Sequence, residues 1–207
     1  MSSAQADQSN DTARLEAFSD GVFAIAITLL VLEIRLPETH GSLSHLLGEL
    51  WPSYSAFVLS FVTIGIMWAN HHAVFRLIAR ASHGLIVANL LLLMTISFLP
   101  FPTGVLAEHL GEAGADQRTA ALFYSGTFIL IAIGFQILWQ TAGRKNRLIY
   151  PGREAAADQI TRSYRLGIPM YVVSTLVALW SPIASVIVVG AIALFWLIPR
   201  GQTAGQN

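Results

Sequence analysis

Cysteine is absent from the 207-residue sequence, which excludes disulfide bonds and metal sites built on thiolates. Charged side chains are scarce, at 12% of residues, which is about half the share that soluble domains carry. The formal net charge is zero, so nothing in the composition favours a nucleic-acid partner. What remains is apolar, with 54% hydrophobic residues and a mean hydropathy of +0.59. This composition is typical of a membrane protein.

Motifs for hydrolytic chemistry are missing as well. The sequence has no His-Glu-x-x-His run, no paired carboxylates within an apolar segment and no serine arranged with a base. It also lacks the Thr-Val-Gly-Tyr-Gly filter of tetrameric potassium channels. We therefore expect no enzyme activity and no cofactor.

Six apolar stretches are near or above the roughly 17–25 residues that a spanning helix needs. The first lies between Arg14 and Arg35, whose 20 intervening residues rise about 30 Å as a helix, the thickness of the hydrocarbon core. The other five are 51–77, 84–106, 119–143, 160–180 and 182–198. We predict an all-α polytopic membrane protein with one six-helix transmembrane domain over 14–199. A disordered tail at 1–13 and a second tail at 200–207 flank it.

Prolines and a short connection refine these spans. Pro100 and Pro102 predict a bend or an end in the third span, which could stop at Leu99 and leave a re-entrant stub. Pro169 predicts a kink in the fifth span. The fifth and sixth spans are separated by so few residues that we expect a tight hairpin.

Basic residues fall on alternate sides of the predicted spans. If the N-terminus is cytoplasmic, only Arg35 and Arg118 lie outside, and the other ten of the 12 lie inside. The inside residues are Arg14, Arg76, Arg80, Arg144, Lys145, Arg147, Arg153, Arg162, Arg165 and Arg200. This asymmetry predicts that both termini are cytoplasmic. The outer loops are acidic, which is either ordinary solvated charge or a vestibule that concentrates cations.

The first span has two different faces. At about 100° per residue, Ile25, Thr28, Leu29 and Leu32 form one narrow stripe. Asp20 lies about 140° from Ile25 and cannot line the same surface. A carboxylate within an apolar helix is costly in lipid, so Asp20 is a candidate functional residue. The alternative is that Asp20 and Glu16 only favour the helix N-terminus through the helix dipole.

Other polar residues share the depth of Asp20, which lies six residues, or about 9 Å of rise, inward of Arg14. They are Ser19, Asn70, His71, His72 and Asn89. A buried carboxylate needs such donors, so one interpretation is a hydrogen-bonded cluster that fixes helix packing. A metal site on His71, His72 and Asp20 is disfavoured because adjacent histidines on a helix diverge by about 100°. Proton sensing by the histidines remains an alternative.

Two motifs carry a family resemblance. They are Arg14-x-x-x-Phe18-Ser19-Asp20, at the start of the first span, and Trp68-x-x-His71-His72, in the second. Together with the six-helix layout, these motifs resemble the transmembrane protein 175 family. Its members are potassium-permeable channels of endosomes and lysosomes, with shorter six-helix relatives in prokaryotes.

The resemblance implies a pore formed by the first helices of a homo-oligomer, a tetramer, in a prokaryotic cell membrane. The isoleucine seven residues after the motif phenylalanine forms the constriction, which is Ile25 here. Leu29 and Leu32 would add apolar rings and Thr28 a polar ring. The polar network with the second and third helices would comprise Arg14, Phe18, Ser19, Asp20, Trp68, His71, His72 and Asn89.

These features predict a potassium channel with a hydrophobic constriction. A narrow apolar neck gates by excluding water, and it offers no oxygens to replace a hydration shell, so we expect modest selectivity over sodium. The partners would be potassium ions, the lipid bilayer and further copies of the chain. Helix packing or lipid contact is the alternative role for the apolar stripe. A secondary transporter coupled to a cation or proton, or a membrane protein without flux, are the alternative functions.

Overall fold

The structure is a computed structural model that describes residues 3–36, 42–143 and 148–197. Apart from one isolated bridge between Ile78 and Ile149, its regular elements are helices. They are α1 (Ser3–Leu29), the 3-10 helix η1 (Leu30–Glu33), α2 (Leu43–Glu49), α3 (Trp51–Phe75), α4 (His83–Phe98), α5 (Pro100–His109), α6 (Ala115–Gly143), α7 (Glu154–Val177) and α8 (Pro182–Leu197). The all-α prediction is confirmed for these residues.

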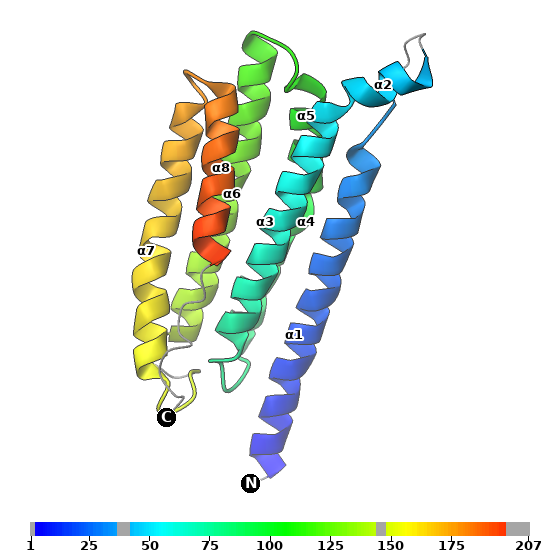
Figure 1. Cartoon of the computed structure of the whole chain (residues 1–207). Coiled ribbons are helices and arrows are strands. Elements are labelled where there is room, and N and C mark those ends of the chain that lie inside the picture. Colours follow the sequence, from blue (N-terminus) through cyan, green and yellow to red (C-terminus); the bar gives the residue numbers. More distant parts are fainter. Residues whose placement is uncertain (1–2, 37–41, 144–147, 198–207) are drawn as a thin grey trace, which may run out of the picture.

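The long helices stand side by side in one bundle and alternate in direction (Figure 1). Helix α1 lies at one edge, where it packs against α3, α4 and α5. Helix α6 contacts α4, α5, α7 and α8, so it occupies the middle of the bundle. The short α2 lies at one end of the bundle, beyond the end of α1 and beside the start of α3 (Figure 1). One side of α1 therefore has no neighbour among the described residues.

Four segments of the described chain are long and apolar enough to cross a membrane: 11–33, 51–75, 83–109 and 115–143. They correspond to the first four predicted spans. Helix α8 is apolar but has only 16 residues. Helix α7 has 24 residues, but its sequence includes charged side chains such as Arg162 and Arg165. The chain is a multi-pass membrane protein by these features.

Helix α1 begins earlier than the sequence predicted. We expected a disordered tail over 1–13, but residues 3–13 are helical. Extending an existing helix costs far less than nucleating one, and no proline or glycine interrupts the chain before Gly21. The second predicted tail, at 200–207, and the basic residues at 144–147 lie outside the described residues.

Prolines shape the third span as predicted. Helix α4 ends at Phe98 and α5 starts at Pro100, since neither Pro100 nor Pro102 can donate a backbone hydrogen bond. Leu99 keeps helical dihedral angles, φ −58° and ψ −33°. The third span therefore continues through Leu99 as one segment, with an interruption of its helical hydrogen bonds, rather than making the stop that would leave a stub.

The last two helices form the predicted hairpin. Ser174 on α7 donates its hydroxyl to the carbonyl of Ser185 on α8 at 3.1 Å, and Ser185 donates back to the carbonyl of Ser174 at 2.8 Å. The amide of Ser181 closes the turn on the carbonyl of Val177 at 2.9 Å. These bonds fix the hairpin that lies beside α6.

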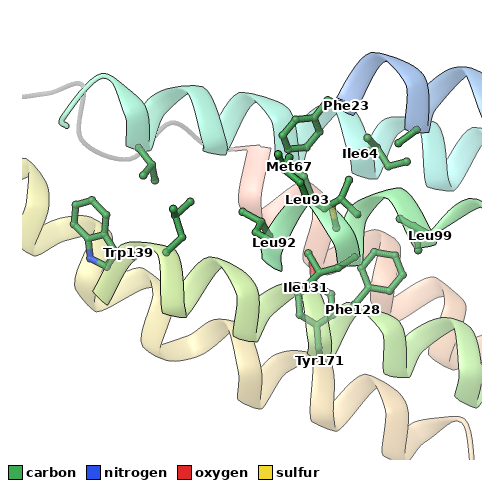
Figure 2. Close-up of a cluster of buried hydrophobic side chains, with 14 of the residues drawn as sticks. Phe23, Ile64, Met67, Leu92, Leu93, Leu99, Phe128, Ile131, Trp139 and Tyr171 are labelled. Carbon is green, nitrogen blue, oxygen red and sulfur yellow. The ribbon is translucent and has the colours of Figure 1, made fainter. Parts of the chain in front are cut away.

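A continuous apolar core joins the helices. Phe23 from α1, Leu92 from α4, Phe128 from α6 and Tyr171 from α7 all contribute to it (Figure 2). Gly134 permits the close approach of α6 to α4, since a Cβ atom there would lie 3.2 Å from the Cα of Leu92. The core therefore fixes the side of α1 that faces the bundle.

Candidate functional site on helix α1

One side of α1 is buried in the bundle. Phe23 and Ala26 are each 1% exposed, and Leu30 is fully buried. Their spacing of three and four residues follows the helical repeat, as expected for a helix that faces a core on one side. Further along the same side, Ser19 is also fully buried. The neighbours of this side are α3 and α4.

The opposite side of α1 presents the predicted apolar stripe. Ile25, Leu29 and Leu32 are 60%, 39% and 64% exposed. Phe18 lies on the same side and is also exposed, seven residues before Ile25. The described residues of the protomer therefore leave this stripe largely uncovered.

The last of these residues lies in η1 rather than in α1. A 3-10 helix has three residues per turn, so side chains three apart point in the same direction. Leu32 therefore points close to the direction of Leu29, and the change of helix type keeps both on the exposed side.

Thr28 lies on the exposed side and donates its hydroxyl to the carbonyl of Ile25 at 2.9 Å. This bond uses the single proton of the hydroxyl group. The remaining lone pairs make the Thr28 oxygen an acceptor, which can contact a cation directly or accept a hydrogen bond from a water molecule of its hydration shell.

Two polar pairs join α1 to α3. The indole Nε1 of Trp68 donates to Oδ1 of Asp20 at 2.8 Å. The Nδ1 of His72 lies 2.7 Å from Oε1 of Glu16. Glu16 and Asp20 are four residues apart on α1, and Trp68 and His72 are four residues apart on α3. The order of the partners is reversed because the two helices are antiparallel. The rings of Trp68 and His72 stack with centroids 6.1 Å apart.

A second, fully buried group joins α1, α3 and α4. The amide Nδ2 of Asn89 donates to the hydroxyl of Ser19 at 2.8 Å, and Ser19 donates to the carbonyl of Leu15 at 2.8 Å. The Oδ1 of Asn89 can only accept, so Nε2 of His71, 2.8 Å away, carries the proton. The other ring nitrogen of His71, Nδ1, has no hydrogen-bond partner among the described residues. Asn89 is therefore the centre of a directional three-helix link.

Aromatic rings enclose the imidazole of this group. The His71 ring stacks on Phe75 with centroids 4.4 Å apart and meets Phe23 edge-on at 5.3 Å. All three side chains are buried. The group is therefore shielded from the exposed side of α1.

The structure places some predicted network residues elsewhere. Arg14 is exposed and makes no hydrogen bond or ion pair with the described residues, and Phe18 faces outward with the apolar stripe. Asp20 is only partly buried, and its partner is Trp68 rather than His71. Within the described ranges no three potential ligands gather into a metal site, since His71 and His72 point to different partners.

Sequence reasoning missed two features. Glu16 pairs with His72, and its signal was the spacing of four residues from Asp20. A buried hydroxyl chain also links α3, α5 and α6: Ser60 lies 2.9 Å from Oγ1 of Thr103 and 3.0 Å from the hydroxyl of Tyr124. Single hydroxyl residues in apolar helices gave no pattern by which to find it.

Four apolar spans in the described chain and a polar network that ties three of them together define a polytopic helical membrane protein. The family model described as "Endosomal/lysosomal potassium channel TMEM175" matches residues 14–100, which include both motifs. A potassium channel of Chamaesiphon minutus is 46% identical over 200 residues, which are 94% of this chain and 97% of that protein. A potassium channel of Streptomyces collinus is 44% identical over 190 residues, 90% and 92% of the two chains.

The fold agrees with these sequence matches. The crystal structure of a lysosomal potassium-selective channel TMEM175 homolog from Chamaesiphon minutus superposes with a TM-score of 0.81 at 45% identity, over 90% of this chain and 96% of that one. The chain belongs to the TMEM175 family. The resemblance drawn from the motifs is confirmed, and the relatives are named as ion channels rather than enzymes.

Proposed function

We propose that the chain is a potassium-permeable channel whose ion path is lined by the exposed side of α1. The observation that carries the proposal is the stripe of Ile25, Leu29 and Leu32, which is apolar, regular and left largely uncovered by the described residues. The bacterial relatives that match almost the whole chain are named potassium channels, which supports the permeant ion. Potassium is the permeant species and the proposal needs no cofactor.

The proposed topology has six crossings with both termini in the cytoplasm, in a prokaryotic cell membrane. Helices α7 and α8 continue the alternation of direction that the four apolar spans begin (Figure 1). Their neighbours α3 and α6 lie within two of those spans. A 24-residue helix rises about 36 Å, enough to cross the hydrocarbon core, although the 16 residues of α8 rise only about 24 Å. The excess of basic residues on one side sets the orientation.

A single protomer cannot enclose a pore with one helix face, so the proposal requires an oligomer. We propose a homotetramer, as the family resemblance implies, in which four copies of α1 face a common axis. Three rings of apolar side chains would then extend over seven residues, about 10 Å of α-helical rise. A neck of this kind excludes water, and therefore ions, until it widens.

Selectivity would arise from a polar ring within this neck rather than from its apolar side chains. Apolar side chains offer no oxygen to replace water around potassium, so the neck alone separates potassium from sodium only weakly. The hydroxyl oxygen of Thr28 is an acceptor because its proton is used on the carbonyl of Ile25. A ring of such oxygens would favour a cation that has lost part of its hydration shell.

The polar groups behind the stripe would hold α1 in its orientation. Asn89 ties α1 to α3 and α4 through buried hydrogen bonds, and Trp68 holds the carboxylate of Asp20 from α3. Each of these contacts lies away from the apolar stripe. We propose that they fix the rotation of α1, and hence the width of the neck.

Flux into liposomes that contain only this protein tests the proposal. A potassium gradient should drive passive uptake, smaller sodium uptake, and unitary currents in planar bilayers. Protein-free liposomes provide the control. Absence of potassium flux, or transport that strictly requires a second ion or a proton, would show that the chain is a transporter or a protein without flux.

A further inference from the structure

A cleft is lined by residues of α6 and α7. Figure 1 shows α7 at the edge of the bundle opposite α1. The volume of the cleft is about 630 Å³. The polar residues that line it are Gln136, Gln140 and Thr141 on α6, and Thr161 and Arg165 on α7. Gln136 and Gln140, like Thr161 and Arg165, are four residues apart and so share a helix face. The cleft therefore presents a row of polar side chains on the surface of an apolar helix bundle.

Most hydroxyl groups in the cleft are already engaged. Thr141 donates to the carbonyl of Ile137 at 2.8 Å. Thr161 donates to the carbonyl of Ala157 at 2.9 Å and accepts from the indole of Trp139 at 2.8 Å. These residues therefore have no proton left to offer a ligand.

Three side chains in the cleft keep a polar group without a partner among the described residues: Gln136, Gln140 and Arg165. The Oε1 of Gln136 is buried and receives no hydrogen bond from the described residues. Arg165 is exposed, and its guanidinium forms no ion pair or hydrogen bond within the described chain. A buried acceptor without a donor is unfavourable. The cleft is therefore complementary to a ligand that carries both an anion and a hydrogen-bond donor.

The depth of these groups identifies the ligand as a lipid. Arg165 lies five residues, about 7.5 Å of rise, inside the span predicted to start at residue 160, and Gln136 lies seven residues, about 10 Å, before Gly143 at the end of α6. A guanidinium at this depth is costly unless it snorkels to the headgroups or meets an anion. Exposed Ile137 and Leu166 flank the cleft with apolar surface for acyl chains.

We propose that the α6–α7 cleft binds the headgroup of an anionic phospholipid with free hydroxyls, of the phosphatidylglycerol class. The phosphate contacts the guanidinium of Arg165, in the bidentate geometry that arginine favours. A headgroup hydroxyl donates to Oε1 of Gln136 after the amide of this residue, which lines the cleft, turns toward it. The inference rests on α7 crossing the bilayer, and it is independent of which ion the channel conducts. Phosphatidylcholine offers the phosphate but no donor, so it satisfies only half of the site.

Lipid retention in nanodiscs tests the proposal. The whole protein is placed in phosphatidylcholine alone, in phosphatidylcholine with phosphatidylglycerol, and in phosphatidylcholine with excess inorganic phosphate in solution. Native mass spectrometry counts retained phosphatidylglycerol and the number of protomers, and thermal unfolding gives Tm. We expect the wild-type protein to retain phosphatidylglycerol and to gain Tm only in the second preparation.

Arg165→Gln should lower the binding constant for phosphatidylglycerol about tenfold, the factor that corresponds to about 1.4 kcal/mol. Arg162→Gln is the matched control, because Arg162 is an exposed arginine on the same helix but does not line the cleft. It should retain the lipid as the wild-type protein does. Equal losses in both variants would show general attraction to an anionic membrane and would overturn the site.

Gln136→Leu tests the contact with the headgroup hydroxyl separately from the contact between the phosphate and Arg165. The variant removes the unpaired acceptor, so the difference in Tm between phosphatidylglycerol and phosphatidylcholine should shrink. An unchanged difference would contradict the hydroxyl contact. Stabilisation by inorganic phosphate alone would identify a free anion as the ligand, and loss of the oligomer in Arg165→Gln would identify the cleft as a subunit contact. Either result would overturn the lipid proposal.

Discussion

Replacing Ile25 with asparagine should increase potassium current. Ile25 is 60% exposed in the protomer, so the substitution removes little buried apolar area. A surface change of this kind alters the free energy of unfolding by only about 0.5 kcal/mol or less. Any large effect on current would therefore arise where the four copies of α1 meet rather than from loss of the fold.

The magnitude follows from the wetting of the proposed neck. Each asparagine offers water a hydrogen bond with a net value of about 0.5 kcal/mol, and four copies offer about 2 kcal/mol. If wetting limits permeation, lowering its barrier by about 2 kcal/mol raises the current about 30-fold. Selectivity for potassium over sodium should fall at the same time, because a wetter neck admits more fully hydrated ions.

Single-channel recording in planar bilayers measures both quantities. Val31→Asn is the matched control, since Val31 is 53% exposed on the same segment but lies on a different side of it from Ile25. Its current should stay near that of the wild-type protein. Unchanged current and selectivity in Ile25→Asn, or an equal increase in the control, would refute the assignment of the stripe to the ion path.

Three further substitutions test the packing behind the stripe by thermal unfolding in detergent. Asn89→Ala should destabilise the protein by about 2 kcal/mol because it leaves buried polar partners unpaired, and a Tm within error of the wild-type value would contradict the three-helix link. Gly134→Ala should destabilise by about 1–3 kcal/mol since its Cβ would crowd the backbone of Leu92, whereas Gly126→Ala, with open space around it, should stabilise by up to about 1 kcal/mol. Glu16→Gln removes a partly exposed pair and should change stability by less than about 1 kcal/mol; a larger loss would mean that the pair is a main anchor of α1.

Much of the helical architecture could be predicted from the sequence because hydrophobic length and proline position act locally. The prolines at 100 and 102 had to interrupt the third span wherever it packed, and the short 178–181 connection had to fold back. The start of α1 could not be predicted in the same way. The polar composition of 3–13 suggested disorder, but a helix already nucleated downstream extends through residues that would not form one alone.

The two faces of α1 were predictable for the same reason, since helical rotation depends on one segment only. The hydrogen-bond partners of its polar side chains could not be predicted, because they depend on how the neighbouring helices are rotated. His71 and Trp68 both lie on α3 at about the depth of Asp20, but the carboxylate meets the indole, whereas the imidazole turns inward to Asn89. The role of the exposed stripe depends on further copies of the chain, and it stays a prediction.

The absence of native cysteine makes the central claim directly testable. In an Ile25→Cys variant every thiol of the channel lies at the proposed neck, and Cd²⁺ binds soft thiolate ligands tightly. Potassium current through this variant should be blocked by Cd²⁺ and restored by a chelator, while a Val31→Cys channel should be insensitive. The account would be contradicted if Cd²⁺ left the current through Ile25→Cys unchanged and blocked the current through Val31→Cys. That result would place another side of α1 on the ion path.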